Sequence, residues 1–256
     1  MILDRFNLAG KVAVITGAAT GLGRGIAVGL AEAGAEIAGV YNHSEPAETR
    51  TSVEGAGREF HAIQADLSTT EPIAGIVEQA IERFGRLDIL VNNAGIIRRA
   101  PSVDFTEEDW DAVMNVNLKG CFLVSKHGVI QMLAQGGGSI INMASAAGII
   151  GFPLLASYCA TKGGVVQLTK SMALEYRPAN VRVNAICPSL IETDLGDRFV
   201  ESYNAAGIPA EELLMSMQGR MGTVQDVAGV ALFLASDDSS FVNGVALPVD
   251  GGACAG

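Results

Sequence analysis

The sequence predicts an α/β fold in which one doubly wound parallel sheet of about seven strands carries helices on both faces. Short β-branched runs alternate with longer helical patterns along the whole chain, as strand–helix–strand units require. The runs are apolar almost throughout, which is typical of strands covered on both faces. With 256 residues, 49% hydrophobic and 18% charged, the chain can bury one large core. We therefore expect a single domain over residues 1–256.

Strands are expected where the buried apolar runs lie. They are 11–16, 36–41, 60–65, 87–92, 139–144 and 182–187, with a last strand at 244–249. The helical patterns lie between them, at 22–33, 71–84, 106–134, 157–177 and 224–235. Ligands of such sheets bind beyond the carboxyl ends of the strands. Functional residues should therefore follow directly after the strand ends.

The turn after the first strand, "TGAATGLGRG", is rich in glycine and leads into a helical pattern. Gly17, Gly21 and Gly23 allow a tight turn and let backbone N–H groups approach a pyrophosphate at the positive end of the helix. Thr20 and Leu22 belong to the same loop. A glycine-rich turn without a ligand is the alternative, but the position between strand and helix favours a dinucleotide site of the Rossmann type.

The end of the second strand bears on the choice of cofactor. It reads Tyr41, Asn42, His43, with no acid before Glu45 to hold the ribose hydroxyls. It also offers no arginine or lysine to pair with a 2′-phosphate. This favours NAD as the cofactor and does not exclude NADP.

Two asparagine-containing segments follow the fourth strand. The turn "NNAG" (92–95), with Asn93, Ala94 and Gly95, suits support of a cofactor by side-chain amides. Asn117, in "NVNLKG", lies within an otherwise apolar helical pattern. Because an asparagine in mid-helix disfavours the helix locally, it has either a structural or a catalytic reason to be there.

A proton-transfer site is expected after the fifth strand. Ser145 lies just beyond that strand, and Tyr158 and Lys162 in "SYCATKGG" share one face of the next helix. A free tyrosine has a pKa near ~10, so its pKa must be lowered for acid–base work near neutrality. A lysine ammonium one turn away has the correct sign to lower it, as has an oxidised nicotinamide. Ser145 can donate a hydrogen bond to a substrate oxygen.

These segments together resemble the short-chain dehydrogenase/reductase family. "TGAATGLG", "NNAG", "NVNLKG", "YCATK" and "NGVALPVDGG" follow the family's order and spacing over essentially the whole chain. The resemblance implies that Asn117, Ser145, Tyr158 and Lys162 form the catalytic set. Tyr158 would exchange the hydroxyl proton, and Lys162 would lower its pKa and bind the nicotinamide ribose. Asn117 would hold a water molecule that relays protons.

The resemblance also implies a set of cofactor contacts. Asp66 would contact adenine and Thr193 would meet the carboxamide. The other implied contacts are Leu67, Asn93, Ala94, Gly95, Pro188 and Ile191. One departure from the family lies here, because Ser189 stands where a glycine usually follows Pro188. If that glycine has a positive φ, the serine is strained and the contact of Ile191 changes.

The reaction expected is hydride transfer between a nicotinamide cofactor and a secondary alcohol or ketone. The N-terminal half, in "MILDRFNLAGKVAVITG", "SEPAET" and "ILVNNAGIIRR", is similar to bacterial 2-deoxy-D-gluconate 3-dehydrogenases, so the substrate expected is a sugar acid or related polyol. Arg98 and Arg99 suit a carboxylate, although two solvated loop arginines are an equal alternative. Residues 194–222 should form a substrate lid, whose leucines and methionines line a pocket or simply pack a helix.

Three alternatives stay open at this point. The lid is similar to those of enzymes for alicyclic alcohols, and a 3-oxoacyl-[acyl-carrier-protein] reductase is a second enzymatic interpretation. The net charge of −11 argues against that one, since such enzymes present basic residues to an acidic carrier. A non-enzymatic nucleotide sensor would not need Asn117, Ser145, Tyr158 and Lys162 together.

Charge and cysteine content indicate the surroundings of the protein. The net charge of −11 makes nucleic acid and anionic membranes poor partners. The four cysteines are widely spaced and the first ten residues carry Asp4 and Arg5, so we expect reduced thiols and a cytoplasmic protein. The three histidines lack metal-ligand spacing, so no metal is expected. By family resemblance the helices 106–134 and 157–177 would pair between subunits in a homotetramer.

Overall fold

The computed structural model describes residues 1–210, 212 and 217–255. Its centre is a seven-stranded parallel sheet in the order β3-β2-β1-β4-β5-β6-β7. The chain starts in the middle with β1, runs outward to β3, and crosses back to β4 on the other side of β1. The strands are β1 Val12–Thr16, β2 Glu36–Tyr41, β3 Phe60–Gln64, β4 Ile89–Asn92, β5 Gly138–Met143, β6 Val181–Pro188 and β7 Ala246–Val249.

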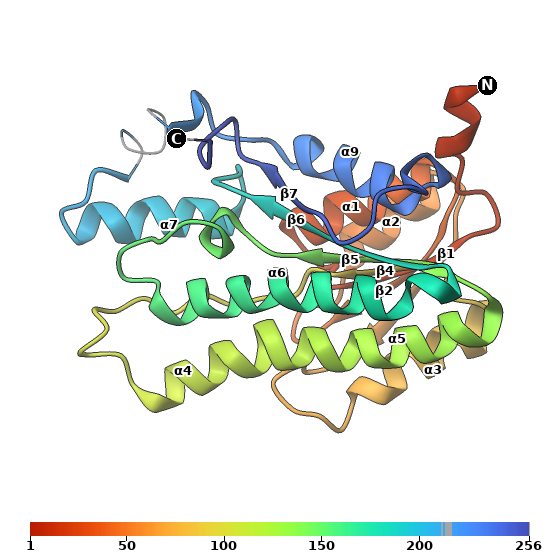
Figure 1. Cartoon of the computed structure of the whole chain (residues 1–256), viewed down its shortest axis with the longest axis horizontal. Coiled ribbons are helices and arrows are strands. Elements are labelled where there is room, and N and C mark those ends of the chain that lie inside the picture. The colour runs from red at the N-terminus through yellow and green to blue at the C-terminus, as the bar shows by residue number, and fades with distance from the viewer. Residues whose placement is uncertain (211, 213–216, 256) are drawn as a thin grey trace.

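Helices cover both faces of the sheet (Figure 1). One layer holds α1 Gly21–Glu32, α2 Ala47–Gly55 and α9 Val224–Ala235. The other holds α3 Ile73–Phe84, α4 Glu107–Met114, α5 Cys121–Gln135 and α6 Ala156–Tyr176. Short turns of helix are η1 Ile2–Phe6, η3 Ala146–Gly148, η4 Arg177–Ala179 and η5 Asp237–Ser239. The remaining described helix, α7 Asp194–Ala205, lies beyond the carboxyl ends of the strands (Figure 1). The expected doubly wound fold is confirmed.

The strand predictions agree with the structure to within two residues at each end. The sequence predicts one helix over 106–134. The structure divides this stretch into α4 and α5, because a π-helical segment, η2 Asn115–Gly120, lies between them. The sequence pattern also missed α2. Its residues are polar almost throughout and only Thr49 and Val53 are buried, so no apolar stripe marks it as a helix.

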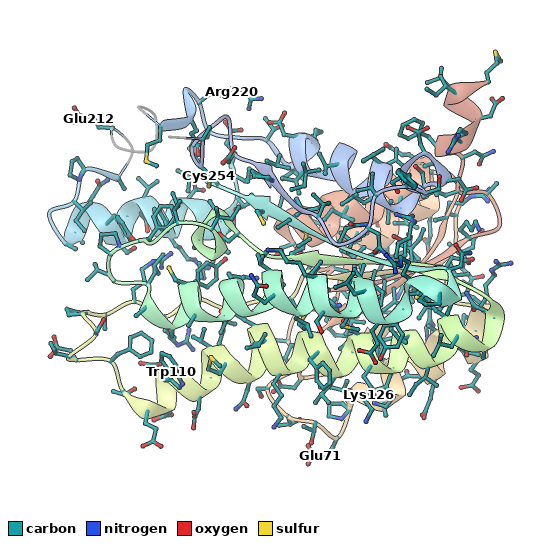
Figure 2. The ribbon with its side chains drawn as sticks, viewed as in Figure 1. Glu71, Trp110, Lys126, Glu212, Arg220 and Cys254 are labelled. Atoms are coloured by element: carbon teal, nitrogen blue, oxygen red, sulfur yellow. The ribbon has the colours of Figure 1, made fainter. Side chains whose placement is uncertain are left out.

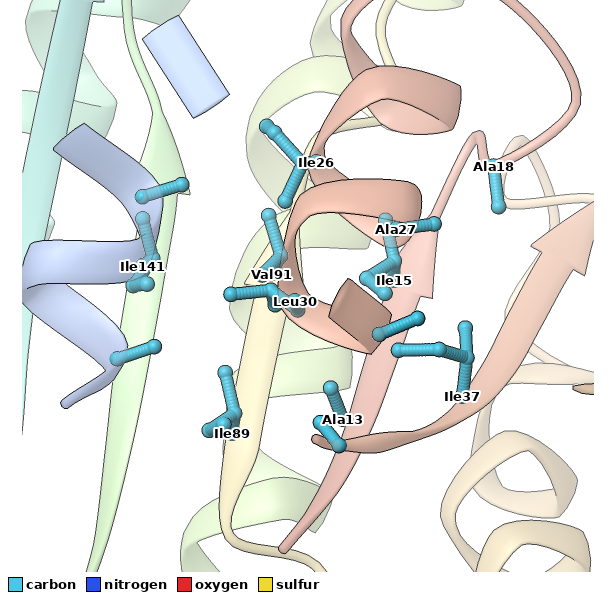
Figure 3. Packing of buried hydrophobic residues seen from close by; sticks show 14 of the residues in the cluster. Ala13, Ile15, Ala18, Ile26, Ala27, Leu30, Ile37, Ile89, Val91 and Ile141 are labelled. Atoms are coloured by element: carbon cyan, nitrogen blue, oxygen red, sulfur yellow. The ribbon is translucent and has the colours of Figure 1, made fainter. Parts of the chain in front are cut away.

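A hydrophobic core between α1 and the sheet holds α1 in place. Ile26, Ala27 and Leu30 of α1 are fully buried against Ile15 and Val91 of the two central strands (Figure 3). Burying one such leucine or isoleucine stabilises the fold by roughly 1.5–3 kcal/mol. The start of α1 is therefore held firmly at the carboxyl end of β1.

Three further features concern the chemistry of the molecule. All four cysteines are free thiols. Within the ranges described above, no helix is long and apolar enough to cross a membrane, and no three histidine, cysteine or acidic side chains gather as a metal site would require.

Candidate active site

A cleft of about 570 Å³ opens at the carboxyl ends of the strands. Loops that follow β1 to β6 line it, as the fold predicts for a ligand site. It brings together most of the residues expected from the sequence, namely Gly17, Thr20, Gly21, Leu22, Tyr41, Asn42, Asp66, Leu67, Asn93, Ala94, Gly95, Ser145, Tyr158, Lys162, Pro188, Ile191 and Thr193. Gly23, Arg98, Arg99 and Asn117 do not form part of its wall.

The glycine-rich loop is shaped to receive an anion. Gly17 and Gly21 have positive φ angles of 67° and 53°. A Cβ added to Gly23 would lie 2.0 Å from the carbonyl oxygen of Gly17 and 2.6 Å from Nδ2 of Asn93, so only glycine fits there. Helix α1 begins without an acidic residue in its first turn, and Thr20 at its N-cap makes no side-chain hydrogen bond. Its first N–H groups are thus open to a pyrophosphate, and the residues present fit a dinucleotide.

The turn "NNAG" is tied to this loop by hydrogen bonds. Asn93 Nδ2 donates to the carbonyl oxygens of Thr16 (3.0 Å) and Gly17 (3.2 Å). The hydroxyl oxygen of Thr16 accepts the N–H groups of Asn93 (2.9 Å) and Ala94 (3.0 Å). Asn92 is instead buried and donates to the hydroxyl of Ser125 in α5 at 2.8 Å. Asn93 therefore orders the cofactor loop, whereas Asn92 belongs to the core.

An ionised carboxylate lies near the ends of β2 and β3. The Asp66 side chain accepts the Ser68 N–H (2.8 Å), and this bond is the largest cause that lowers the pKa of Asp66. The Ser68 hydroxyl and the Asn42 amide lower it further. Asp66, at the end of β3, thus lies against Asn42 at the end of β2. No sequence pattern indicates this contact, because the two residues lie 24 positions apart.

Ser145 and Tyr158 meet at the other end of the cleft. Ser145 is the N-cap of η3, where its hydroxyl oxygen accepts the Ala147 N–H (3.1 Å) while its hydroxyl reaches the Pro188 carbonyl oxygen at 3.5 Å. Burial raises the pKa of Tyr158 to about 12, while the neighbouring Ser145 hydroxyl and the positive charge of Arg99 act in the opposite direction. At neutral pH Tyr158 is a proton donor in this structure.

Lys162 lies beside the Tyr158 ring and is held there by a backbone carbonyl group. Its Nζ lies 5.5 Å from the centre of the Tyr158 ring and donates to the Met143 carbonyl oxygen at 2.6 Å. Lys162 is only 4% exposed, and burial lowers its own pKa to about 8. In the chain by itself, burial of each group thus dominates its own pKa, and the lowering of the Tyr158 pKa by Lys162 together with a bound nicotinamide stays a prediction.

Asn117 has a structural reason for its place in a helix. It lies in the π-helical segment η2, and its Oδ1 accepts the Ile96 N–H (2.8 Å) while its Nδ2 donates to the Ile96 carbonyl oxygen (2.9 Å). Nδ2 also reaches the Thr161 hydroxyl at 3.4 Å, one helix turn from Tyr158. The side chain therefore holds the loop after β4 against the helix that carries Tyr158.

Comparison with known proteins shows the family to which the chain belongs. The family model described as Enoyl-(Acyl carrier protein) reductase matches residues 17–254. The chain is 46% identical over 254 residues to the 2-dehydro-3-deoxy-D-gluconate 5-dehydrogenase of Dickeya dadantii, covering 98% of both proteins. It belongs to the short-chain dehydrogenase/reductase family. It is therefore an NAD(P)-dependent oxidoreductase that acts on CH–OH groups.

Two further comparisons show relatives with a different named substrate and with a bound cofactor. The chain is 41% identical to the 3-oxoacyl-[acyl-carrier-protein] reductase of Thermotoga maritima, over 96% of this chain and 98% of that protein. Its structure is similar to that of a gluconate 5-dehydrogenase from Burkholderia cenocepacia in complex with NADP and tartrate. The TM-score is 0.90, with 39% identity and complete coverage of both chains.

Ser189, the departure from the usual family pattern, carries no strain. Among the described residues, the non-glycine residues with positive φ are Leu154 and Asn180. The serine therefore occupies a backbone conformation open to any residue, and the expected strain is corrected. Pro188 and Ile191 still line the cleft on either side of it.

The segment 194–222 contributes a leucine to the cleft, as expected, and an aromatic side chain that was not expected. Leu195 and Phe199 of α7 line the cleft. Phe199 stacks on Tyr203, with ring centres 4.2 Å apart, and meets Phe152 edge-on at 6.5 Å. Leu213, Leu214 and Met215 of the same segment lie outside the described residues. The aromatic rings of Phe152 and Phe199 thus line the cleft near Ser145 and Tyr158.

Arg98 and Arg99 have different surroundings, although they are neighbours in sequence. Arg98 is exposed, and its Nε donates to the Asp109 carboxylate at 3.1 Å. Arg99 lies with its guanidinium 5.3 Å from the centre of the Phe199 ring. Arg99 is half-buried, and this burial lowers the pKa of its guanidinium. The structure therefore separates the two candidates for substrate contact.

Proposed function

We propose that the protein oxidises a secondary alcohol of a sugar acid, or of a related polyol, to the ketone with NAD, and catalyses the reverse reduction. The observation that carries the proposal is the contact of Ser145 and Tyr158 in a cleft whose other end has an open helix N-terminus. Sugar acids are favoured because a relative at 46% identity is a 2-dehydro-3-deoxy-D-gluconate 5-dehydrogenase. A bound nicotinamide supplies the hydride chemistry.

The chain's own residues provide the proton transfer. In the reduction, the Tyr158 hydroxyl donates its proton to the substrate oxygen, and Ser145 holds that oxygen by a hydrogen bond. In the oxidation, Tyr158 accepts the proton of the alcohol. Lys162 keeps a positive charge beside the Tyr158 ring and would bind the nicotinamide ribose, while the Met143 carbonyl oxygen holds Nζ in position. We assign Asn117 the proposed water relay only through its backbone, because its side chain is occupied by Ile96.

The cofactor-binding residues are proposed on the same basis. Gly17, Thr20, Gly21, Leu22 and Gly23 would hold the pyrophosphate. Tyr41, Asn42, Asp66 and Leu67 would bind the adenosine, and the remaining contacts would be those of Asn93, Ala94, Gly95, Pro188, Ile191 and Thr193. We favour NAD because no arginine or lysine from the end of β2 lines this part of the cleft. A relative that is crystallised with NADP supports the opposite choice.

A panel of substrates with both cofactors tests the proposal. We expect turnover of gluconate or 2-deoxygluconate with NAD to exceed that with NADP, and to exceed turnover of cyclohexanol or acetoacetyl thioesters. The thioester arm is included because a relative at 41% identity is a 3-oxoacyl-[acyl-carrier-protein] reductase. The cyclic alcohol is included because aromatic rings line the substrate end. If the kcat/KM is highest for the thioester or for the cyclic alcohol, that compound class replaces the sugar acids as the proposed substrates.

We further propose that the protein is a homotetramer. The outer helix layer exposes large apolar side chains, of which Leu174 is 68% and Ile130 58% accessible. Phe122 and Leu133 lie on α5 with Ile130, and Trp110 lies on α4 in the same layer (Figure 2). Light scattering should give a tetramer for the natural chain and smaller species for Ile130→Glu. A natural chain that scatters as a monomer would rule the assembly out.

The domain organisation and the location are proposed as well. One domain over residues 1–256 would carry residues 194–222 as a lid over the substrate. The ends of this segment are joined, since Ile191 pairs with Gly222 in a short parallel bridge. A cytoplasmic location is supported by four free thiols.

A further inference from the structure

Gln218 is a buried glutamine whose amide is bound to the backbone at both of its ends. Only 7% of the residue is exposed. Its Nε2 donates to the carbonyl oxygens of Leu190 (3.0 Å) and Arg220 (2.7 Å), and its Oε1 accepts the Leu190 N–H at 3.4 Å. A buried amide without partners is costly, and these bonds remove that cost. The Gln218 amide and the backbone of Leu190 therefore hold each other in place.

The contact with Leu190 extends a short backbone pairing. The Gly222 N–H donates to the Leu190 carbonyl oxygen (3.0 Å), and the Glu192 N–H donates to the Gly222 carbonyl oxygen (2.9 Å). Ile191 lies between these two bonds, in the parallel bridge with Gly222. A side-chain amide offers the same kinds of donor and acceptor as a peptide group. Gln218 thus acts as one more member of the pairing, although it contributes its side chain and not its backbone.

The segment 190–193, which this pairing fixes, reaches from one part of the cleft to another. Three of its members lie in the cleft wall, namely Leu190, Ile191 and Thr193. The Thr193 Cγ2 lies 3.7 Å from the position that a Cβ on Gly21 would take, so the segment touches the glycine-rich loop. Just before the segment, the Pro188 carbonyl oxygen lies 3.5 Å from the Ser145 hydroxyl. The nicotinamide half of a dinucleotide would have to bind between these two contacts.

The C-terminal turn packs closely on the backbone of Gln218. A Cβ on Gly251 would lie 2.4 Å from the Gln218 carbonyl oxygen. Gly251 has a φ of 62°, and the Asp250 carboxylate accepts the N–H groups of Gly252 (2.9 Å) and Cys254 (2.9 Å) in the same turn. The turn therefore supports Gln218 through backbone atoms, which cannot rotate out of the way as a side chain can.

Packing alone does not explain an amide at this position. An apolar side chain of similar size would fill the same space without the cost of burying polar atoms. It would, however, leave the Leu190 N–H without the acceptor that Gln218 provides, and a buried donor without an acceptor is destabilising. The specific contribution of Gln218 is thus the orientation of the peptide groups of Leu190, next to the cleft.

We infer that Gln218 is a positioning residue for the nicotinamide half of the cofactor, because its amide fixes residues 190–193 in the conformation that receives the nicotinamide ring. This rests on the proposed function, in which Pro188, Ile191 and Thr193 contact the cofactor. Gln218 itself does not line the cleft, so it acts through this segment.

The test compares the binding of two ligands that differ only in the nicotinamide ring. The first is whichever of NADH and NADPH the natural chain binds more tightly, and the second is ADP-ribose or its 2′-phosphate. In Gln218→Met, which keeps the length of the side chain and loses the amide, we expect the Kd of the dinucleotide to rise about tenfold, as loss of one or two hydrogen bonds does. The Kd of the ring-less ligand should change by less than about twofold.

Gln225→Met is the matched control for this variant. Gln225 lies in α9, seven positions further along the chain, and its side chain is exposed outside the cleft. The same replacement there should leave the Kd of both ligands unchanged.

A second pair of variants tests the same contact from the C-terminal turn. Gly251 and Gly252 have positive φ angles of 62° and 97°, so alanine introduces backbone strain at both. Only the new Cβ at Gly251 would meet Gln218, since a Cβ at Gly252 has no atom within 4 Å among the described residues. Gly251→Ala should therefore weaken binding of the dinucleotide selectively, and Gly252→Ala should not.

The possible results separate the inference from the proposed function. If Gln218→Met weakens the binding of both ligands equally, or of neither, the positioning role is wrong and the proposed function stands. Thermal unfolding shows whether each variant is folded, and the two glycine variants decide the question should Gln218→Met be unfolded. Equal effects of Gly251→Ala and Gly252→Ala on dinucleotide binding would then overturn the inference. A natural chain that binds neither NADH nor NADPH would contradict the proposed function, and the inference with it.

Discussion

Replacing Tyr158 by phenylalanine is expected to lower kcat by about 10²- to 10⁴-fold while cofactor binding is retained. The change removes only the hydroxyl that donates and accepts the substrate proton, and the ring still packs beside Lys162. Steady-state rates in both directions and cofactor titration by fluorescence provide the measurement. Tyr176→Phe, at the other end of the same helix, is the control and should keep full activity.

The pH dependence should differ between the two directions of the reaction. Burial raises the pKa of Tyr158 to about 12, so its hydroxyl is protonated throughout the neutral range. Reduction uses this proton and should be nearly independent of pH between about 6 and 8, whereas oxidation needs the deprotonated oxygen and should accelerate as pH rises. Undiminished turnover of Tyr158→Phe, or the same pH slope in that variant, would contradict the role of this residue.

The fold could be predicted because the strands of this sheet are buried on both faces. Their apolar runs are visible in sequence, and β1 to β6 then determine where the functional loops must meet. Helix α2 has no apolar stripe, so its place depends on contacts of Thr49 and Val53 that only the tertiary structure supplies. Local patterns predict elements that carry their own burial signal, and they miss those that are held by their neighbours.

The sequence predicts which residues gather at the candidate site, but it does not predict their pKa values or their burial. The spacing of Tyr158 and Lys162 correctly placed them side by side, but the balance between attraction and lost hydration depends on burial by residues far away in sequence. Arg98 and Arg99 likewise cannot be told apart in sequence. Only Asp109 and Phe199, which are brought in by two other elements, distinguish the paired arginine from the buried one.

The second large effect is expected at Gly23, where an added methyl group tests whether the glycine loop is built for a cofactor. Gly23→Ala should lower the free energy of unfolding by about 1–3 kcal/mol and weaken cofactor binding by about tenfold or more. The helix alone would favour alanine by about 1 kcal/mol. The clash decides the sign, because the new Cβ would stand 2.0 Å from the Gly17 carbonyl oxygen, a backbone atom that cannot move without opening the turn.

Gly29→Ala on the same helix separates these two contributions. A Cβ at Gly29 would lie 3.6 Å from the Ala228 Cβ, an ordinary contact, so helix propensity acts there without a clash. Urea unfolding should show Gly29→Ala to be about 0.5–1 kcal/mol more stable than the natural chain, with unchanged cofactor affinity in calorimetry. If both variants gained stability, the loop would be able to rearrange around a side chain. The absence of a Cβ at Gly23 would then no longer support the assignment of the loop to the pyrophosphate.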